Sequence, residues 1–153
     1  MITKKISLAI LLGAMLLLAA GCSAARSSII EPIVLEGTER DAVLDYAQEP
    51  AENLLDGLIA RDYEQFSRDF SETMKQGMDQ QAFADLLAML DNKLGTFQSS
   101  ELVTVLQDEN FTTLVYRLKY ERDNQVSMRV VFDNAEPHSI SGLWFDSPEL
   151  RKN

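Results

Sequence analysis

Apolar residues in the first half of the body of the chain recur at helical spacing. Over residues 43–58, apolar side chains lie three or four positions apart and acidic side chains fill positions between them, a pattern typical of an amphipathic helix. Two further helical stretches follow, one opened by Asp62 as N-cap and one over residues 79–95 between an Asp and a Gly. The pattern therefore predicts three helices, and Pro50 is expected to kink or split the first.

After Gly95 the period of the pattern changes to two. Four segments rich in Val, Leu, Thr and aromatic residues alternate with short polar connections of hairpin length. These predicted strands cover residues 97–106, 111–120, 125–133 and 139–145. Helices followed by an antiparallel meander predict an α+β fold, with the N-terminal helices packed on one face of a sheet of about four strands.

The first residues have the composition of an export signal. Two lysines in residues 1–5 precede an uncharged run, and small residues lead to Cys22, the only cysteine of the chain. Residues 18–22 resemble a bacterial lipobox, although Ala19 stands where that motif most often has Leu. The resemblance implies cleavage before Cys22 and attachment of lipid to it.

Two alternatives for this segment stay open. The uncharged residues 6–25 just reach the roughly 20 residues of a membrane-spanning helix, so an uncleaved anchor is one, and a plain secretory signal is the other. In each case the body of the protein is exported, and a lipid would hold it at the cell membrane or outer membrane. Acylation of Cys22 would leave no thiol for catalysis, a disulfide or a metal.

The chain is therefore divided into a signal peptide, a tether, one domain and a short tail. Their expected boundaries are 1–21, 22–38, 39–150 and 151–153. The apolar half of the tether, residues 29–35, is expected either to stay flexible with the rest or to lie against the domain as an edge strand, which Pro32 would permit.

The negative net charge of the chain limits which kinds of molecule it is expected to bind. The chain has 14 Lys and Arg against 24 Asp and Glu, a formal net charge of −10. Removal of residues 1–21 takes away two lysines and no acid, so the mature chain would carry 12 minus 24, or −12. Nucleic acid is excluded as an expected partner, because binding to a phosphate backbone depends on clustered Lys and Arg.

Several fold-making motifs of the body together resemble a known superfamily. They are the helix end Gly57–Tyr63, the helix-to-strand junction Lys93–Phe97 and the last two predicted strands. Over residues 41–150 the chain resembles the nuclear-transport-factor-2-like superfamily, and within it an uncharacterised prokaryotic domain of unknown function often found on exported proteins. The resemblance implies a cone-shaped curved sheet with a cavity between sheet and helices, and it implies no reaction.

Strand alternation predicts which side chains line that cavity. If even positions point toward the helices, they form a continuous apolar face with polar-tipped aromatic residues. The candidate pocket residues are Tyr116, Tyr120, Met128 and Trp144. The alternative is that the same side chains fill a closed core.

Odd positions on the opposite face carry more apolar residues than a solvated sheet face should. An apolar centre rimmed by basic residues is the composition of an interface with a second copy or an envelope protein. The candidate interface residues are Val115, Arg117, Arg129, Val131 and Phe145. The alternative is cover by residues 29–35 or by the C-terminal tail.

The residues give no pattern for catalysis. Inward strand positions carry no Asp or Glu, and the lone histidine, His138, follows Pro137 in an expected turn away from the cavity. No metal site and no cofactor is predicted. The expected function is a lipid-anchored, non-catalytic module that binds a small apolar ligand or a protein. A small cavity enzyme for an apolar or cyclic substrate, and a structural envelope dimer, are the alternatives.

Overall fold

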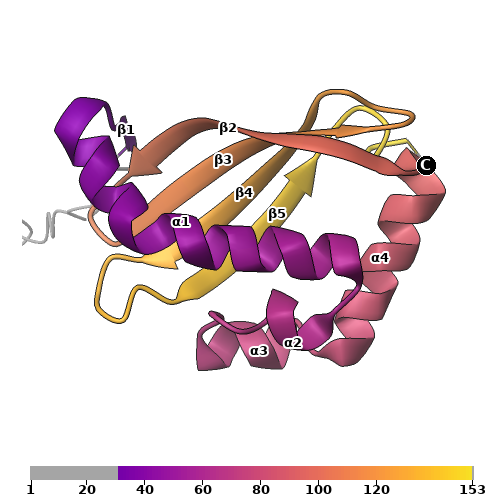
Figure 1. The fold of residues 1–153 in the computed structure, drawn as a ribbon, viewed down its shortest axis with the longest axis horizontal. Helices are drawn as coiled ribbons and strands as arrows, with labels where there is room; N and C mark the ends of the chain where they lie inside the picture. Colours follow the sequence, from indigo (N-terminus) through magenta and orange to yellow (C-terminus); the bar gives the residue numbers. More distant parts are fainter. Residues whose placement is uncertain (1–30, 153) are drawn as a thin grey trace, which may run out of the picture.

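The computed structural model describes residues 31–152, and in it four helices pack against an open antiparallel sheet of five strands (Figure 1). The α+β class is confirmed, and the sheet has one strand more than expected. The elements in chain order are β1 (Ile33–Val34), α1 (Gly37–Ala60), α2 (Tyr63–Phe66), α3 (Glu72–Gly77), α4 (Gln80–Leu94), β2 (Phe97–Gln107), β3 (Phe111–Tyr120), β4 (Val126–Asp133) and β5 (Ile140–Asp146).

The additional strand comes from the apolar half of the predicted tether. β1 pairs with β2 at the edge of the sheet, with Ile33 opposite Gln107, and Leu35 next to it is only 4% exposed. The edge-strand alternative is therefore confirmed. β1 extends the sheet sideways in its plane, so the idea that this segment covers the outer face is wrong. Cys22 and the signal segment lie outside the described residues.

The helices differ from the expected three in two places. α1 is continuous through Pro50, so the expected split does not occur. The second predicted helix is divided into α2 and α3, because the chain between them pairs with β5: the N–H of Ser71 donates to the carbonyl of Ile140 at 2.9 Å. The Ser71 hydroxyl then caps α3 by accepting from the N–H of Met74.

Three register shifts interrupt the sheet, two in the pairing of β2 with β3 and one in the pairing of β4 with β5, and two of the three change the predicted orientation of key side chains. On β3 and β4 the even positions are buried, as expected. The pairing of β2 with β3 shifts by one residue after Leu102, and the pairing of β4 with β5 shifts by one residue at Ser141. Because an extra residue turns every later side chain to the other face, Val105 is buried and Trp144 is 57% exposed on the outer face. Phe145 lies opposite the buried Met128 and faces the helices. Strict alternation predicts that Val105, Leu143 and Phe145 point outward and that Trp144 points toward the helices, and these four predicted orientations are wrong.

α2 crosses α1 at a glycine. A Cβ on Gly57 would lie 2.2 Å from the backbone N and 2.6 Å from the Cα of Phe66. This close approach seats the Phe66 ring against the rings of Phe70 and Phe83, with centroids 5.1 and 4.4 Å away. Gly57 is thus required for the aromatic centre of the helical layer.

Replacing Gly57 tests how strongly the stability of the fold depends on the close approach of α2 to α1. We expect Gly57→Ala to lower the free energy of unfolding by about 3 kcal/mol, because the added methyl meets backbone that cannot move aside cheaply. Gly77→Ala is the matched control, since a Cβ at Gly77 meets nothing within 4 Å. It should be neutral or stabilising by about 0.5–1 kcal/mol. Urea unfolding of both variants checks this, and equal effects of the two would contradict it.

Candidate functional site

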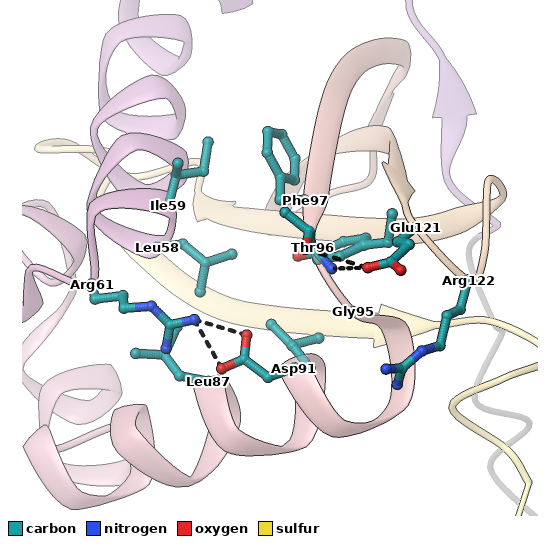
Figure 2. A pocket seen from close by; sticks show the side chains of 12 residues that line it. Leu58, Ile59, Arg61, Leu87, Asp91, Gly95, Thr96, Phe97, Glu121 and Arg122 are labelled. Carbon is teal, nitrogen blue, oxygen red and sulfur yellow. Dashed lines mark hydrogen bonds and ion pairs between the residues drawn. The ribbon is translucent and has the colours of Figure 1, made fainter.

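A cleft of about 440 Å³ opens where α1 ends, α4 ends, β2 begins and β3 ends (Figure 2). Its size falls in the range of about 300–1,000 Å³ that is usual for small-molecule sites. Apolar and charged side chains share the lining, which consists of Leu58, Ile59, Arg61, Leu87, Leu90, Asp91, Gly95, Thr96, Phe97, Tyr120, Glu121 and Arg122.

Arg61 forms one wall of the cleft from an unusual backbone position. It follows the last residue of α1 with φ of 61° and ψ of 33°, the left-handed conformation that glycine usually supplies at this place. Its Nη2 donates to both carboxylate oxygens of Asp91 on α4, each at 2.8 Å, and Figure 2 shows the two side chains pointing toward each other. A left-handed residue other than glycine costs about 1–2 kcal/mol. The hydrogen bond from the backbone N–H of Arg61 to the carbonyl of Gly57 caps α1 and holds Arg61 in this conformation.

The other wall is built at the junction of α4 and β2. Gly95 has φ of 77°, and a Cβ on it would lie 2.8 Å from Oε2 of Glu121. That oxygen accepts hydrogen bonds from the N–H and the hydroxyl of Thr96, both at 3.3 Å. Arg122 donates from Nη1 to the carbonyl of Asn92 at 2.7 Å. The charged groups of this wall are therefore held in place before any ligand arrives.

Tyr120, the last residue of β3, also lines the cleft. It is 5% exposed, and its ring meets the edge of the Phe97 ring with centroids 5.6 Å apart. Burial, with a smaller contribution from the charge of Asp91, raises the pKa of Tyr120 to about 12. The phenol therefore stays protonated at physiological pH and serves as a neutral hydrogen-bond donor. Ile59, which is 47% exposed, supplies apolar surface at the same cleft.

The predicted pocket residues do not come together at one place. Tyr120 lines the cleft, whereas Tyr116 and Met128 are buried in the core cluster and are not among the residues of the cleft lining. Burial, followed by the charge of Glu52, raises the pKa of Tyr116 to about 12. Trp144 lies on the other face of the sheet because of the bulge in β5.

Sequence reasoning missed the charged half of the cleft. The periodic patterns assign no functional role to Arg61, and they do not single out Asp91 or Glu121. One signal was available, because a helix that ends without glycine at its left-handed position is unusual. The pairing of Arg61 with Asp91 joins residues 30 positions apart and is not visible in any local pattern.

Four of the five predicted interface residues share the outer face. Val115 and Val131 are half-buried there, Arg129 is exposed, and Arg117 pairs with Glu101 at 3.4 Å across β2 and β3. Phe145 faces the helices. The outer face of the described residues thus keeps a mixed apolar and basic composition.

The side chain of His138 is partly buried and packs against α1. Its ring stacks on Tyr46 of α1, with centroids 4.0 Å apart and planes at 18°, and Nδ1 lies 3.2 Å from the carbonyl oxygen of Asp133. His138 is not a lining residue of the cleft. Its contacts give it a place in the packing of α1 on the sheet.

No three His, Cys, Asp or Glu side chains in residues 31–152 lie where they could hold a metal ion together. None of the helices in this part of the chain is long and apolar enough to cross a membrane.

A protein-family model matches more than half of the chain. Residues 51–140 match the model of a family described as protein of unknown function, DUF3887, in agreement with the expected domain of unknown function. No curated protein and no solved structure matches the chain.

The strain at Arg61 can be measured by replacing it with two small residues. Arg61→Gly and Arg61→Ala both lose the pair with Asp91, which is about half exposed and so contributes at most about 1 kcal/mol. Only the glycine also relieves the left-handed backbone. We expect Arg61→Gly to be about 1 kcal/mol more stable than Arg61→Ala in denaturant unfolding. Equal stability of the two variants would contradict a strained Arg61.

Proposed function

Because the chain belongs to the DUF3887 family, whose description names no activity, we propose its role from its own residues: a non-catalytic binding module, exported and held at a membrane by lipid on Cys22. The observation that carries the proposal is the cleft, whose charged walls are fixed in advance around partly exposed apolar surface. A curved sheet with helices on one face also supports membership of the nuclear-transport-factor-2-like superfamily (Figure 1).

The lining suggests the chemistry of the ligand. Ile59, Leu87 and Phe97 offer an apolar surface, and Tyr120 adds a protonated phenol to the lining. A small, partly apolar molecule with a hydrogen-bond acceptor at one end would complement both. The neighbouring ion pair of Arg61 and Asp91 would add selectivity for its polar end more than affinity.

Binding is favoured over catalysis by the state of the polar groups in the cleft. A general base needs a free lone pair and a pKa near neutrality. Asp91 is paired with Arg61, Glu121 accepts two hydrogen bonds from Thr96, and the Tyr120 phenol stays protonated. These groups are suited to hold a ligand in place, and a proton-abstracting enzyme is the weaker alternative.

The anchor is tested by the intact mass of the protein extracted from membranes. We expect a chain that begins at Cys22 and carries a diacylglycerol and further acyl groups, because two or more chains are needed for stable attachment. Cys22→Ala should keep residues 1–21 and lack lipid. An unmodified, full-length wild-type chain would instead support an uncleaved anchor.

The cleft is tested by native mass spectrometry of the detergent-extracted protein, before and after denaturation. We expect a bound small molecule that is released on denaturation. Ile59→Lys should lose most of it, because a long charged side chain would occupy the apolar surface of the cleft.

Met89→Lys is the matched control, since Met89 is also a partly exposed apolar helix residue, at 36%, but does not line the cleft. It should retain the ligand. A wild-type protein with no bound molecule, or equal retention by both variants, would contradict the proposed site.

A further inference from the structure

One row of outward-facing residues crosses all five strands of the sheet. Each member is the register partner of the next, and we call this set the central row. Its members are Val34, Leu106, Thr113, Val131 and Gly142. The row contains no charged residue, and Val34 at its β1 end is 59% exposed. It therefore forms an uncharged, mainly apolar strip across the outer face.

Two aromatic side chains widen this strip. A Cβ on Gly142 would lie 2.3 Å from Cη2 and Cζ3 of Trp144, so the indole lies over the β5 end of the central row. Trp144 is nevertheless 57% exposed, and Phe111 on β3 is 41% exposed. Both residues line a hollow of about 520 Å³ on this face together with Val131. Exposed apolar surface of this kind marks a contact with another molecule.

Acidic side chains lie on one side of the central row and basic side chains on the other. Asp133 is two residues beyond Val131 on β4, and Arg129 is two residues before it. Asp108 lies on the same side as Asp133, because both line the hollow at the β2–β3 turn. Arg117 lies on the side of Arg129, toward the end of β3. The order along the strands is therefore acidic, apolar, basic.

The charged groups nearest the central row are not used within the fold. Among the described residues, neither Arg129 nor Asp133 forms an ion pair. The two acids on the basic side are already paired, Glu101 with Arg117 at 3.4 Å and Asp146 with Arg151. Arg129 and Asp133 thus remain for a partner molecule.

We propose that a second copy of the chain binds the outer face, related to the first by a two-fold axis that runs along the central row. This axis reverses the direction along the strands, so the acidic side of each copy meets the basic side of the other. Asp133 then lies opposite Arg129 of the second copy, in two equivalent contacts, and Val131 lies opposite its own counterpart. Two sheets that pack face to face with nearly aligned strands are a common arrangement. This inference does not depend on the cleft.

The arrangement of charge favours a second copy over other occupants. An acidic partner would be repelled by Asp108 and Asp133, and a basic partner by Arg117 and Arg129. A matching surface must carry the same charges in the reverse order, and the two-fold axis turns the outer face into that surface. Because the chain has a net charge of −10, two copies repel over most of their surface. The mixed charge of the outer face makes it suited to bring them together.

The proposal is tested by native mass spectrometry of the detergent-extracted protein, for which we expect a dimer in the wild type. Asp133→Arg and Arg129→Asp each place like charges opposite each other in both equivalent contacts. Each variant alone should raise the dissociation constant at least about a hundredfold, since like charges at an interface cost several kcal/mol. Met89→Lys, on α4 and away from the outer face, is the control and should dimerise like the wild type.

Mixing the two charge variants tests the two-fold arrangement itself. In a pair of one Asp133→Arg chain and one Arg129→Asp chain, both contacts again join opposite charges, so a heterodimer should form about as tightly as the wild-type dimer. Its formation also shows that both variants are folded. A monomeric wild type, a dimer that survives either substitution, or a mixture without heterodimer would overturn the proposal.

Trp144 gives a measurement that needs no variant, because it is the only tryptophan of the chain. As the concentration of the wild-type protein rises and the dimer forms, the emission of Trp144 should shift to the blue and become protected from acrylamide quenching. A dimer whose formation leaves this emission unchanged would place the interface elsewhere and contradict the proposal.

Discussion

The contact between Gly57 and the backbone of Phe66 is the constraint on which both the core and the cleft depend. It lets α2 cross α1 closely enough for Phe66 to meet Phe70 and Phe83, and this joins α1, α2 and α4 into one layer. The same turn ends α1, because the carbonyl of Gly57 accepts from the N–H groups of Arg61 and Asp62. The position of the Arg61 side chain at the cleft is therefore a consequence of how the helical layer closes.

The local patterns of the sequence were sufficient to predict most of the elements. Helical spacing gave α1 and α4, and the alternation of β3 and β4 placed Leu114 and Val130 correctly in the core. These predictions succeed because period and capping are properties of neighbouring residues. The division of α2 from α3 could not be predicted, since it depends on Ser71 pairing with Ile140, almost 70 residues away.

The site was predicted less well than the fold, for a related reason. Tyr120 was expected at a cavity, and it lines one, but its charged neighbours Asp91 and Glu121 come from separate elements. Their approach is fixed by the left-handed turns at Arg61 and Gly95, which set the directions of the chain as it leaves α1 and α4. The backbone conformation at Arg61 and Gly95 thus decides which side chains meet at the cleft. The spacing of hydrophobic residues carries no information about that conformation.

The bulge at Ser141 in β5 shows how a departure from alternation decides which side chains reach the core and which reach the surface. Had β5 kept a strict period of two from Ile140, Trp144 would lie under the helices, where the core already holds Met128 and Phe132 at no exposure. Because of the extra residue at Ser141, Leu143 and Phe145 face the helices and pack against that core. The indole of Trp144 instead points to the outer face and lies over Gly142. The same shift buries Ser141 Oγ without a partner. One inserted residue therefore accounts for both the exposed indole of Trp144 and the buried, unsatisfied hydroxyl of Ser141.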